Sequence, residues 1–172
     1  MKETLDVITA TQEYVEEIYP LLRKADMKEL KAGQGIFTPK ERLEASFNNA
    51  EQCYVGISKS TRKPVLIFGV NPSLTASTGI IWMMGTDEIT SHKKHLFAHT
   101  QYWLDKLGSK YEVLSNIVMA SNRLHVNWIM KVGFFVFRKP IFLEGYKYYL
   151  FWMFPGRHKL IEEMLKEVKN NV

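Results

Sequence analysis

Cysteine is nearly absent from this sequence: Cys53 is the one cysteine among 172 residues, which excludes an internal disulfide. The first ten residues, MKETLDVITA, lack the apolar core of a secretory signal peptide, so we expect a reducing compartment. Cys53 has no histidine or basic residue beside it in the sequence, and we expect a buried, inert thiol. Internal repeats, low-complexity tracts and linkers are also missing, so residues 1–172 are predicted to form a single domain.

A long uninterrupted apolar run is missing as well. Residues 64–86 carry no charged side chain, yet their middle contains the turn formers Asn71, Pro72 and Gly79. Such a break favours two strands joined by a loop over a membrane-spanning helix. With 46% apolar and 24% charged residues, the chain has enough apolar surface to form a globular core.

The excess of basic over acidic residues is small. There are 23 basic and 18 acidic side chains, so the net charge is +5 and the field around the protein is weak. Two basic clusters, at residues 59–63 and 92–95, could attract phosphate groups. The ordinary alternative is that these side chains are solvated on exposed turns.

The spacing of apolar residues predicts the order of the elements. A strand begins near Leu5, an amphipathic helix runs from about Tyr14 to Leu22, and residues 23–35 are ambiguous. A capping box at Thr38 and Glu41 predicts a helix over 39–48. The remaining predicted elements are strands at 53–57, 65–70 and 79–85, a helix at 91–107, a strand at 113–119, a helix at 124–132, strands at 134–142 and 146–154, and a terminal helix around 160–168.

This order predicts an α+β protein with a mixed, mostly antiparallel seven-stranded sheet. Three consecutive strands before residue 86 favour antiparallel pairing, because short loops join antiparallel neighbours. Strand, helix and strand from Gly79 to Met119 favour a parallel crossover in the middle of the same sheet.

The element order and one local motif carry a resemblance to a known family. In residues 122–134, NRLHVNWIMKVGF, an Asn is followed by a helix and then by a Gly-Phe pair, at Asn122, Gly133 and Phe134. This pattern resembles the GNAT acetyltransferase superfamily, whose sheet opens between its central parallel strands to admit acyl coenzyme A. The resemblance implies a GNAT-like sheet with helices on both faces, here with an extra C-terminal helix.

A narrower resemblance lies within residues 79–137. The residues that carry it are Ile81, Trp82, Thr86, Asp87, Lys93, Lys94, Tyr102, Leu107, Lys110, Tyr111, Asn116, Val118, Asn122, His125, Lys131, Val132, Gly133 and Phe137. They are similar to a family of internal virion proteins from T7-like short-tailed phages, which are degenerate relatives of the acetyltransferases. This resemblance implies action during phage infection, in assembly of the virion core or on a host protein. It also implies a location in the cytoplasm of the infected bacterium or in the virion.

The GNAT resemblance implies which residues would bind acetyl coenzyme A. Active relatives hold the pyrophosphate with glycines and a helix N-terminus after the fourth strand. This chain has the segment TDEITSHKKH there, with no glycine after Gly85. The candidate cofactor-binding residues are therefore Ser91, His92, Lys93, Lys94 and His95, together with Asn122 for the cofactor arm.

Acyl transfer from a thioester to an amine also requires a base and an acid. The family's usual acid is a Tyr seven residues after the Asn, where this chain has Ile129. The strand that usually carries the base is apolar over residues 80–84, so no catalytic residue is assigned. We expect a protein that is weak or inactive as an acetyltransferase and acts through protein contacts. The alternative is an active acetyl-CoA-dependent N-acyltransferase for a protein or small amine, with histidines or Tyr102 as the proton carriers.

Two further patterns suggest other ligands. His92, His95 and His99 have helical spacing that permits a zinc site, but a fourth ligand is not obvious and Lys94 opposes a dication, so we expect no metal. The last two predicted strands alternate aromatic and basic residues, of which Phe135, Phe137, Tyr149 and Phe151 are expected in the core. The other face would be an exposed aromatic surface, which favours a protein contact, most simply a homodimer, over nucleic-acid binding.

Overall fold

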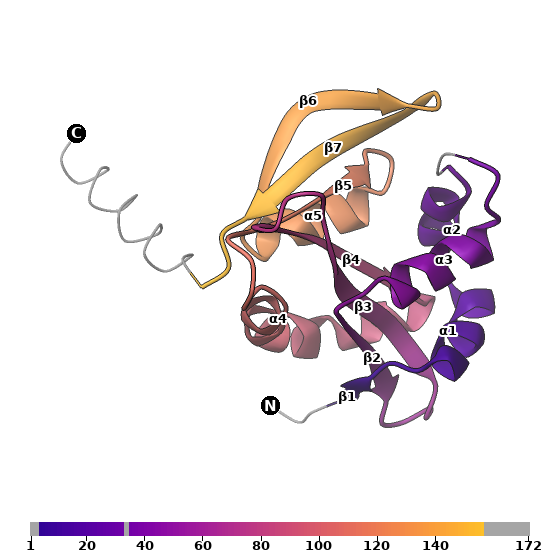
Figure 1. The fold of residues 1–172 in the computed structure, drawn as a ribbon. Helices are drawn as coiled ribbons and strands as arrows, with labels where there is room; N and C mark the ends of the chain where they lie inside the picture. The colour runs from indigo at the N-terminus through magenta and orange to yellow at the C-terminus, as the bar shows by residue number, and fades with distance from the viewer. Residues whose placement is uncertain (1–3, 33–34, 157–172) are drawn as a thin grey trace.

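Seven strands form one sheet in the computed structural model, which describes residues 4–32 and 35–156. The strands are β1 (Leu5–Thr9), β2 (Gln52–Ser58), β3 (Pro64–Pro72), β4 (Thr78–Gly85), β5 (Val113–Met119), β6 (Phe135–Leu143) and β7 (Tyr146–Met153). Their order across the sheet is β1-β2-β3-β4-β5-β7-β6 (Figure 1). The pair β4 and β5 is parallel and the other neighbouring pairs are antiparallel, which confirms the predicted mixed sheet.

Five α-helices and two 3-10 segments connect the described strands. The helices are α1 (Gln12–Ile18), α2 (Lys24–Lys31), α3 (Pro39–Asn48), α4 (Lys93–Leu107) and α5 (Arg123–Lys131), with 3-10 segments η1 (Tyr19–Leu21) and η2 (Asp87–His92). Helix α2 occupies the stretch that the sequence left ambiguous, and η2 replaces the first residues of the helix predicted from Ser91. The helix predicted around 160–168 lies outside the described residues.

Helix α3 begins and ends where the capping signals place it. The Thr38 hydroxyl accepts a hydrogen bond from the Glu41 backbone N–H at 3.3 Å, and the Glu41 carboxylate accepts one from the Thr38 N–H at 2.6 Å. Pro39 takes the first helical position, where a missing N–H leaves no bond unmade. The capping box predicted from the sequence is confirmed.

The helices cover both faces of the sheet, because β2 and β3 are apolar on both sides. Val55 and Ile67 pack against Val15, Ile18, Leu30 and Leu43 of α1, α2 and α3. On the opposite face, Leu66, Phe68 and Val70 pack against Leu104, Leu107, Val126 and Ile129 of α4 and α5. Alternate residues of β3 therefore point to different helix layers, as the period of two along a strand requires.

Residues 64–86 form strands β3 and β4 with a loop between them, as the sequence predicted. In the described part of the chain, no helix is both long and apolar enough to cross a membrane. Cys53 at the start of β2 is buried, and burial raises the pKa of its thiol to about 12. The predicted burial of this thiol is therefore confirmed, and the raised pKa supports the expectation that it is inert.

The β6–β7 hairpin corrects one prediction. Phe151 is buried, but Phe135 is 42% and Phe137 is 49% exposed. The register explains the difference: Val136 lies directly opposite Phe151, and directly opposed residues share a face of the sheet. Phe135 and Phe137 therefore point to the other face, and β6 is an edge strand with β7 as its one neighbour in the sheet (Figure 1).

Candidate functional site

The two central parallel strands separate soon after they pair. Strand β4 pairs with β5 only from Thr78 to Ile80, opposite Val113 to Ser115, although both strands continue further. At the point of separation, the Asn116 side-chain amide donates a hydrogen bond to the Ile81 carbonyl at 2.8 Å. Beyond this contact the sheet opens between β4 and β5.

A cavity of about 170 Å³ lies at this opening. Most of its wall is apolar and comes from the sheet and from the two helices that cover it, with Phe68, Trp103, Leu104, Ile129 and Phe151 among the lining residues. The polar lining residues are Glu29, His95, His99, Thr100, Asn116 and His125. The opening is thus a mainly apolar chamber with ionisable groups in its wall.

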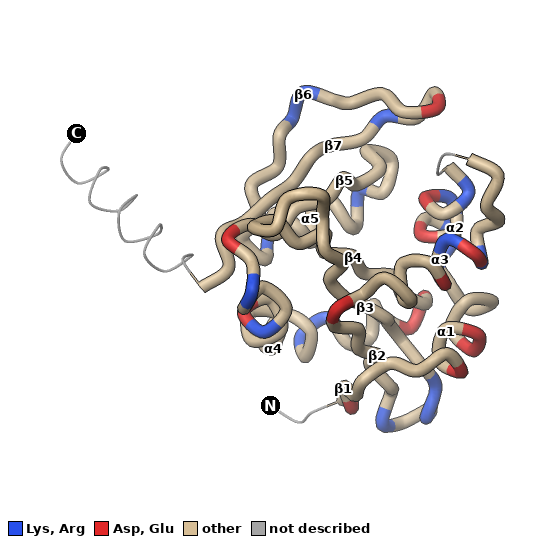
Figure 2. The backbone as a smooth tube through the Cα atoms, in the orientation of Figure 1, with Lys and Arg blue, Asp and Glu red and all other residues tan. Residues whose placement is uncertain are grey.

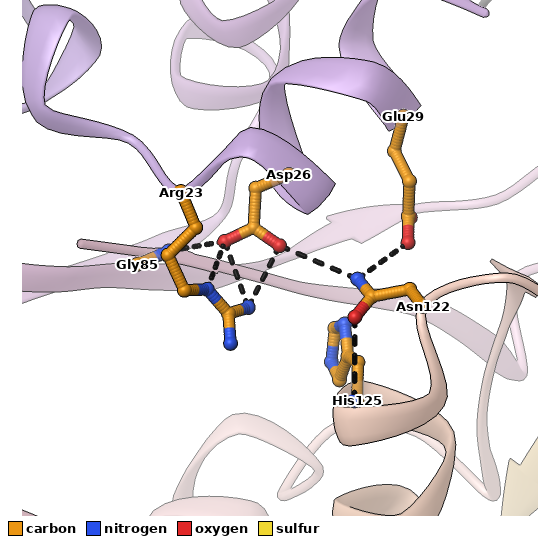
Figure 3. Close-up of polar contacts among 6 residues, drawn as sticks. All are labelled: Arg23, Asp26, Glu29, Gly85, Asn122 and His125. Atoms are coloured by element: carbon orange, nitrogen blue, oxygen red, sulfur yellow. Dashed lines mark hydrogen bonds and ion pairs between the residues drawn. The ribbon is translucent and has the colours of Figure 1, made fainter. Parts of the chain in front are cut away.

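Helix α2 carries two carboxylates, Asp26 and Glu29, and Glu29 lines the cavity. Asp26 is almost fully buried, and its carboxylate accepts three hydrogen bonds from the Arg23 guanidinium, the shortest at 2.7 Å. The same carboxylate accepts a hydrogen bond from the Gly85 backbone N–H at 2.9 Å, which ties α2 to the end of β4 (Figure 3). A buried ion pair with this many hydrogen bonds holds α2 in one position against the sheet.

Asn122 connects α2 to α5. Its side-chain oxygen accepts a hydrogen bond from the His125 backbone N–H and so caps α5. Its amide nitrogen donates to Glu29 at 2.8 Å and to Asp26 at 3.4 Å, so the side chain lies between the two helices (Figure 3). The asparagine therefore serves both as a helix cap and as a hydrogen-bond donor to two carboxylates.

Glu29 is a carboxyl group in the cavity wall whose pKa lies near neutral pH. Burial raises the pKa of its carboxyl to about 7, and the nearby Asp26 carboxylate adds to the rise, while the Asn122 hydrogen bond opposes it. A carboxyl group with a pKa near 7 can accept a proton under physiological conditions and release it again. It has the properties that a general base requires.

His125 lies in the wall of the same cavity. Burial lowers the pKa of its imidazole to about 4, so the ring is neutral at pH 7. Its Nδ1 atom is buried and has no hydrogen-bond partner within residues 4–32 and 35–156. A buried nitrogen without a partner costs free energy, and a ligand in the cavity could supply the missing hydrogen bond.

A larger groove adjoins the cavity between α4 and α5. Its volume is about 920 Å³, within the range of small-molecule sites, and its lining includes Lys93, Lys94 and Lys131. Figure 2 shows basic positions on α4, and it shows basic and acidic positions together on α2 and α3. The groove therefore offers positive charge next to an apolar cavity.

The structure separates the six candidate cofactor-binding residues into four places. Lys93 and Lys94 line the groove. His92 and His95 turn toward Thr4, which contacts the His92 Nδ1 at 2.9 Å and donates its N–H to the His95 Nδ1 at 3.3 Å. Ser91 is exposed at the end of η2 and does not line the groove. Asn122, the sixth candidate, is buried against α2.

Two other predictions concern groups in this region. His92 belongs to η2 and His99 to α4, and among the described residues no group of three or more His, Cys, Asp or Glu side chains could hold a metal ion. Ile129, which stands where the family has its tyrosine, is buried in the cavity wall. The family's acid position is thus part of the apolar lining.

Arg23, Asp26 and Glu29 were not identified from the sequence. The three residues follow one another at intervals of three, which places them on one side of a helix. This spacing indicates that the three side chains lie on the same side of a helix. However, the neighbouring lysines give the segment the composition of a solvent-exposed helix, so the sequence does not indicate that this side is buried. Their burial is visible only once α2 is packed against β4 and α5.

A mixed sheet that opens between its parallel central strands, with helices on both faces, is the fold of the GNAT N-acetyltransferases. One similar solved structure is spermidine N-acetyltransferase from Vibrio cholerae in complex with CoA and spermine, with a TM-score of 0.65 and 12% identity over 90% of this chain and 98% of that one. A GNAT-family acetyltransferase from Streptococcus pneumoniae has a TM-score of 0.60 and 13% identity over 88% and 99% of the two chains. Another from Bacillus anthracis has a TM-score of 0.60 and 14% identity over 90% and 97%.

These identities are low, so the likeness shows the fold and not the activity. No protein-family model and no curated protein sequence matches the chain.

Proposed function

We propose that this chain is an acyl-CoA-dependent N-acyltransferase in which Glu29 is the general base. The observation that supports the proposal is the position of Glu29 in the wall of the β4–β5 cavity, with a pKa of about 7. The expectation of a weak or inactive enzyme depended on missing proton carriers at the family's usual positions. Glu29 lines the opening between β4 and β5 from helix α2. This helix lies outside residues 122–134, which carry the family motif in the sequence.

The residues around the cavity and groove fit a coenzyme A thioester. The positive charges of Lys93, Lys94 and Lys131 suit its phosphates. Residues 87–92 form a 3-10 segment in which no residue has a positive φ, so the lysine side chains contribute to this anchor in place of a glycine-rich turn.

The groups in the cavity wall have the protonation states that acyl transfer needs. A bound acyl-CoA supplies an activated acyl group: the amine nitrogen forms a bond to the carbonyl carbon, the carbon–sulfur bond breaks, and the coenzyme leaves as a thiol. The Glu29 carboxylate takes the proton that the amine loses and can return it to the departing sulfur, so one proton is conserved. His125 contributes a neutral imidazole that can make one hydrogen bond to the reacting groups.

Release of free thiol from acetyl-CoA in the presence of amines tests this proposal. Spermidine and peptides with a free N-terminus form a suitable first panel, the former because one structural neighbour is a spermidine N-acetyltransferase. Glu29→Gln should lower kcat by about 100-fold or more, since general base catalysis contributes 10² to 10⁴-fold. Glu17→Gln on the exposed side of α1 is the matched control and should leave kcat unchanged. Absence of acetyl-CoA binding in calorimetry would instead support the inactive alternative.

A second proposal concerns partners and comes from the β6–β7 hairpin. Its exposed apolar side chains are Phe135, Phe137, Ile141, Phe142 and Tyr146. An exposed apolar patch of this kind favours a protein contact, and the resemblance to phage internal virion proteins suggests a virion or host protein as the partner, or a second copy of the chain. Sedimentation equilibrium of the wild type and of Phe142→Ser tests the dimer. Mass spectrometry of purified phage particles tests association with the virion.

A further inference from the structure

The cavity between β4 and β5 extends well beyond the two ionisable side chains that we assign to the reaction, Glu29 and His125. Glu29, Asn116 and His125 form part of its wall. The remaining wall reaches under both covering helices as far as Leu107 of α4 and Phe134 after α5. Such a chamber is larger than a two-carbon acetyl group requires.

Its size and lining select an apolar occupant. An apolar cavity of about 150 Å³ lined by leucine, isoleucine and phenylalanine stays dry and accepts a six-carbon ring. The cavity here has about 170 Å³ and a similar lining. A water molecule needs two to four polar partners, which the apolar part of this wall does not offer.

The cavity and the basic groove are adjacent. Four residues line both of them, namely Met83, Leu96, His125 and Trp128. A ligand whose phosphates lie at Lys93 and Lys94 can therefore continue past this shared wall toward Glu29. A chain attached beyond the thioester would then enter the apolar part of the chamber.

We propose that the acyl donor carries an apolar chain of about six carbons, and that the cavity under α4 and α5 binds this chain. The inference rests on the proposed acyltransferase function and names its donor class. It follows from the juxtaposition of a basic groove, a carboxyl group that can accept a proton and a mainly apolar chamber, which adjoin one another.

Calorimetric titration with CoA, acetyl-CoA, hexanoyl-CoA and decanoyl-CoA tests the inference without relying on catalysis. Hexanoyl-CoA has four more methylene groups than acetyl-CoA, and full burial of each tightens binding about fourfold, or about 200-fold in total. Even with partial burial, we expect hexanoyl-CoA to bind at least about tenfold tighter than acetyl-CoA. Decanoyl-CoA should bind no tighter than hexanoyl-CoA, because the chamber is too small for the added carbons. The order of thiol release rates with the three thioesters should be the same.

A pair of variants locates the chain. Val132 lines the cavity, so Val132→Phe should reduce the preference for hexanoyl-CoA over acetyl-CoA to about threefold or less. Val136 packs against the same core without lining the cavity, and Val136→Phe is the matched control that should keep the wild-type preference. Thermal unfolding of both variants shows whether each of them folds. If a variant does not fold, the titration of the wild-type protein with the four ligands still tests the inference.

The outcomes separate the inference from the function on which it rests. If no thioester and no free CoA binds, the proposed acyltransferase function is wrong and the inference falls with it. If acetyl-CoA and hexanoyl-CoA bind equally well, the enzyme proposal stands and the inference is overturned, since the chamber then holds the pantetheine arm alone. A preference for hexanoyl-CoA that survives Val132→Phe also contradicts the inference.

Discussion

The raised pKa of Glu29 makes a quantitative prediction for stability. A rise from 4.5 to about 7 on folding means that the folded protein binds more protons than the unfolded chain between these two pH values. Stability contributed by the protonated carboxyl is therefore fully present below pH 4.5 and is lost as the pH rises through 7. The full loss is about 3 kcal/mol, which is an upper value because Glu29 keeps some contact with solvent.

Glu29→Gln isolates this effect. The glutamine amide keeps an oxygen that can accept the hydrogen bond from Asn122, but it cannot ionise. We expect the free energy of unfolding of Glu29→Gln minus that of the wild type to increase between pH 4.5 and 7 by about 2 to 3 kcal/mol and to level off above pH 8. Titrating groups that do not interact with Glu29 contribute equally to both proteins, so their contributions cancel in the difference.

Urea denaturation followed by tryptophan fluorescence at pH 5, 6, 7 and 8 measures this difference. Glu17→Gln on the exposed side of α1 is the control, and its difference from the wild type should vary by less than about 0.5 kcal/mol over the range. A difference for Glu29→Gln that is equally flat with pH would refute the argument. The carboxyl would then ionise as freely as in the unfolded chain and could not have the proposed role as a base at neutral pH.

Three further predictions concern other parts of the molecule. Lys94→Glu should weaken acetyl-CoA binding at least about tenfold in calorimetry, whereas Lys63→Glu on the β2–β3 turn should not, because only the former lysine lines the groove. Cys53 should react with a thiol reagent no faster than the protein unfolds, since its thiol is buried with a pKa of about 12; a rapid reaction in the folded state would contradict this placement. Arg23→Ala should lower the free energy of unfolding by about 3 to 5 kcal/mol at pH 7, as measured by circular dichroism in urea, because the Asp26 carboxylate loses its buried partner. A loss below about 1 kcal/mol would show that this pair is solvated.

The sequence predicted the elements whose signals are local. The helix from Pro39 to Asn48 and the strand from Val113 to Met119 have the same bounds in the structure as in the prediction. Both depend on interactions between residues a few positions apart, namely a capping box and a short apolar run. The order of such elements also sufficed to predict the fold class.

The candidate site could not be predicted in the same way. Glu29 and Asn122 are 93 positions apart in the chain, and the hydrogen bond between them exists only because α2 packs at the end of β4 beside α5. The direction in which Phe135 and Phe137 point was also decided by pairing with β7, since the register places Val136 opposite the buried Phe151. Alternation along a strand specifies two faces but does not specify which of them is covered.

The sequence alone therefore determined the succession of helices and strands, the parallel crossover and the basic residues near the start of α4. Tertiary structure decided which carboxyl group lies at the opening of the sheet and near what pH it ionises. The physical reason is that hydrogen bonds of caps and the periodicity of apolar residues are properties of neighbouring positions, whereas desolvation and electrostatic interaction depend on whatever part of the chain packs nearby. For Glu29, those neighbours include Asn122 at the start of α5, Met119 of β5 and Asp26 of its own helix, and burial raises its pKa to about 7.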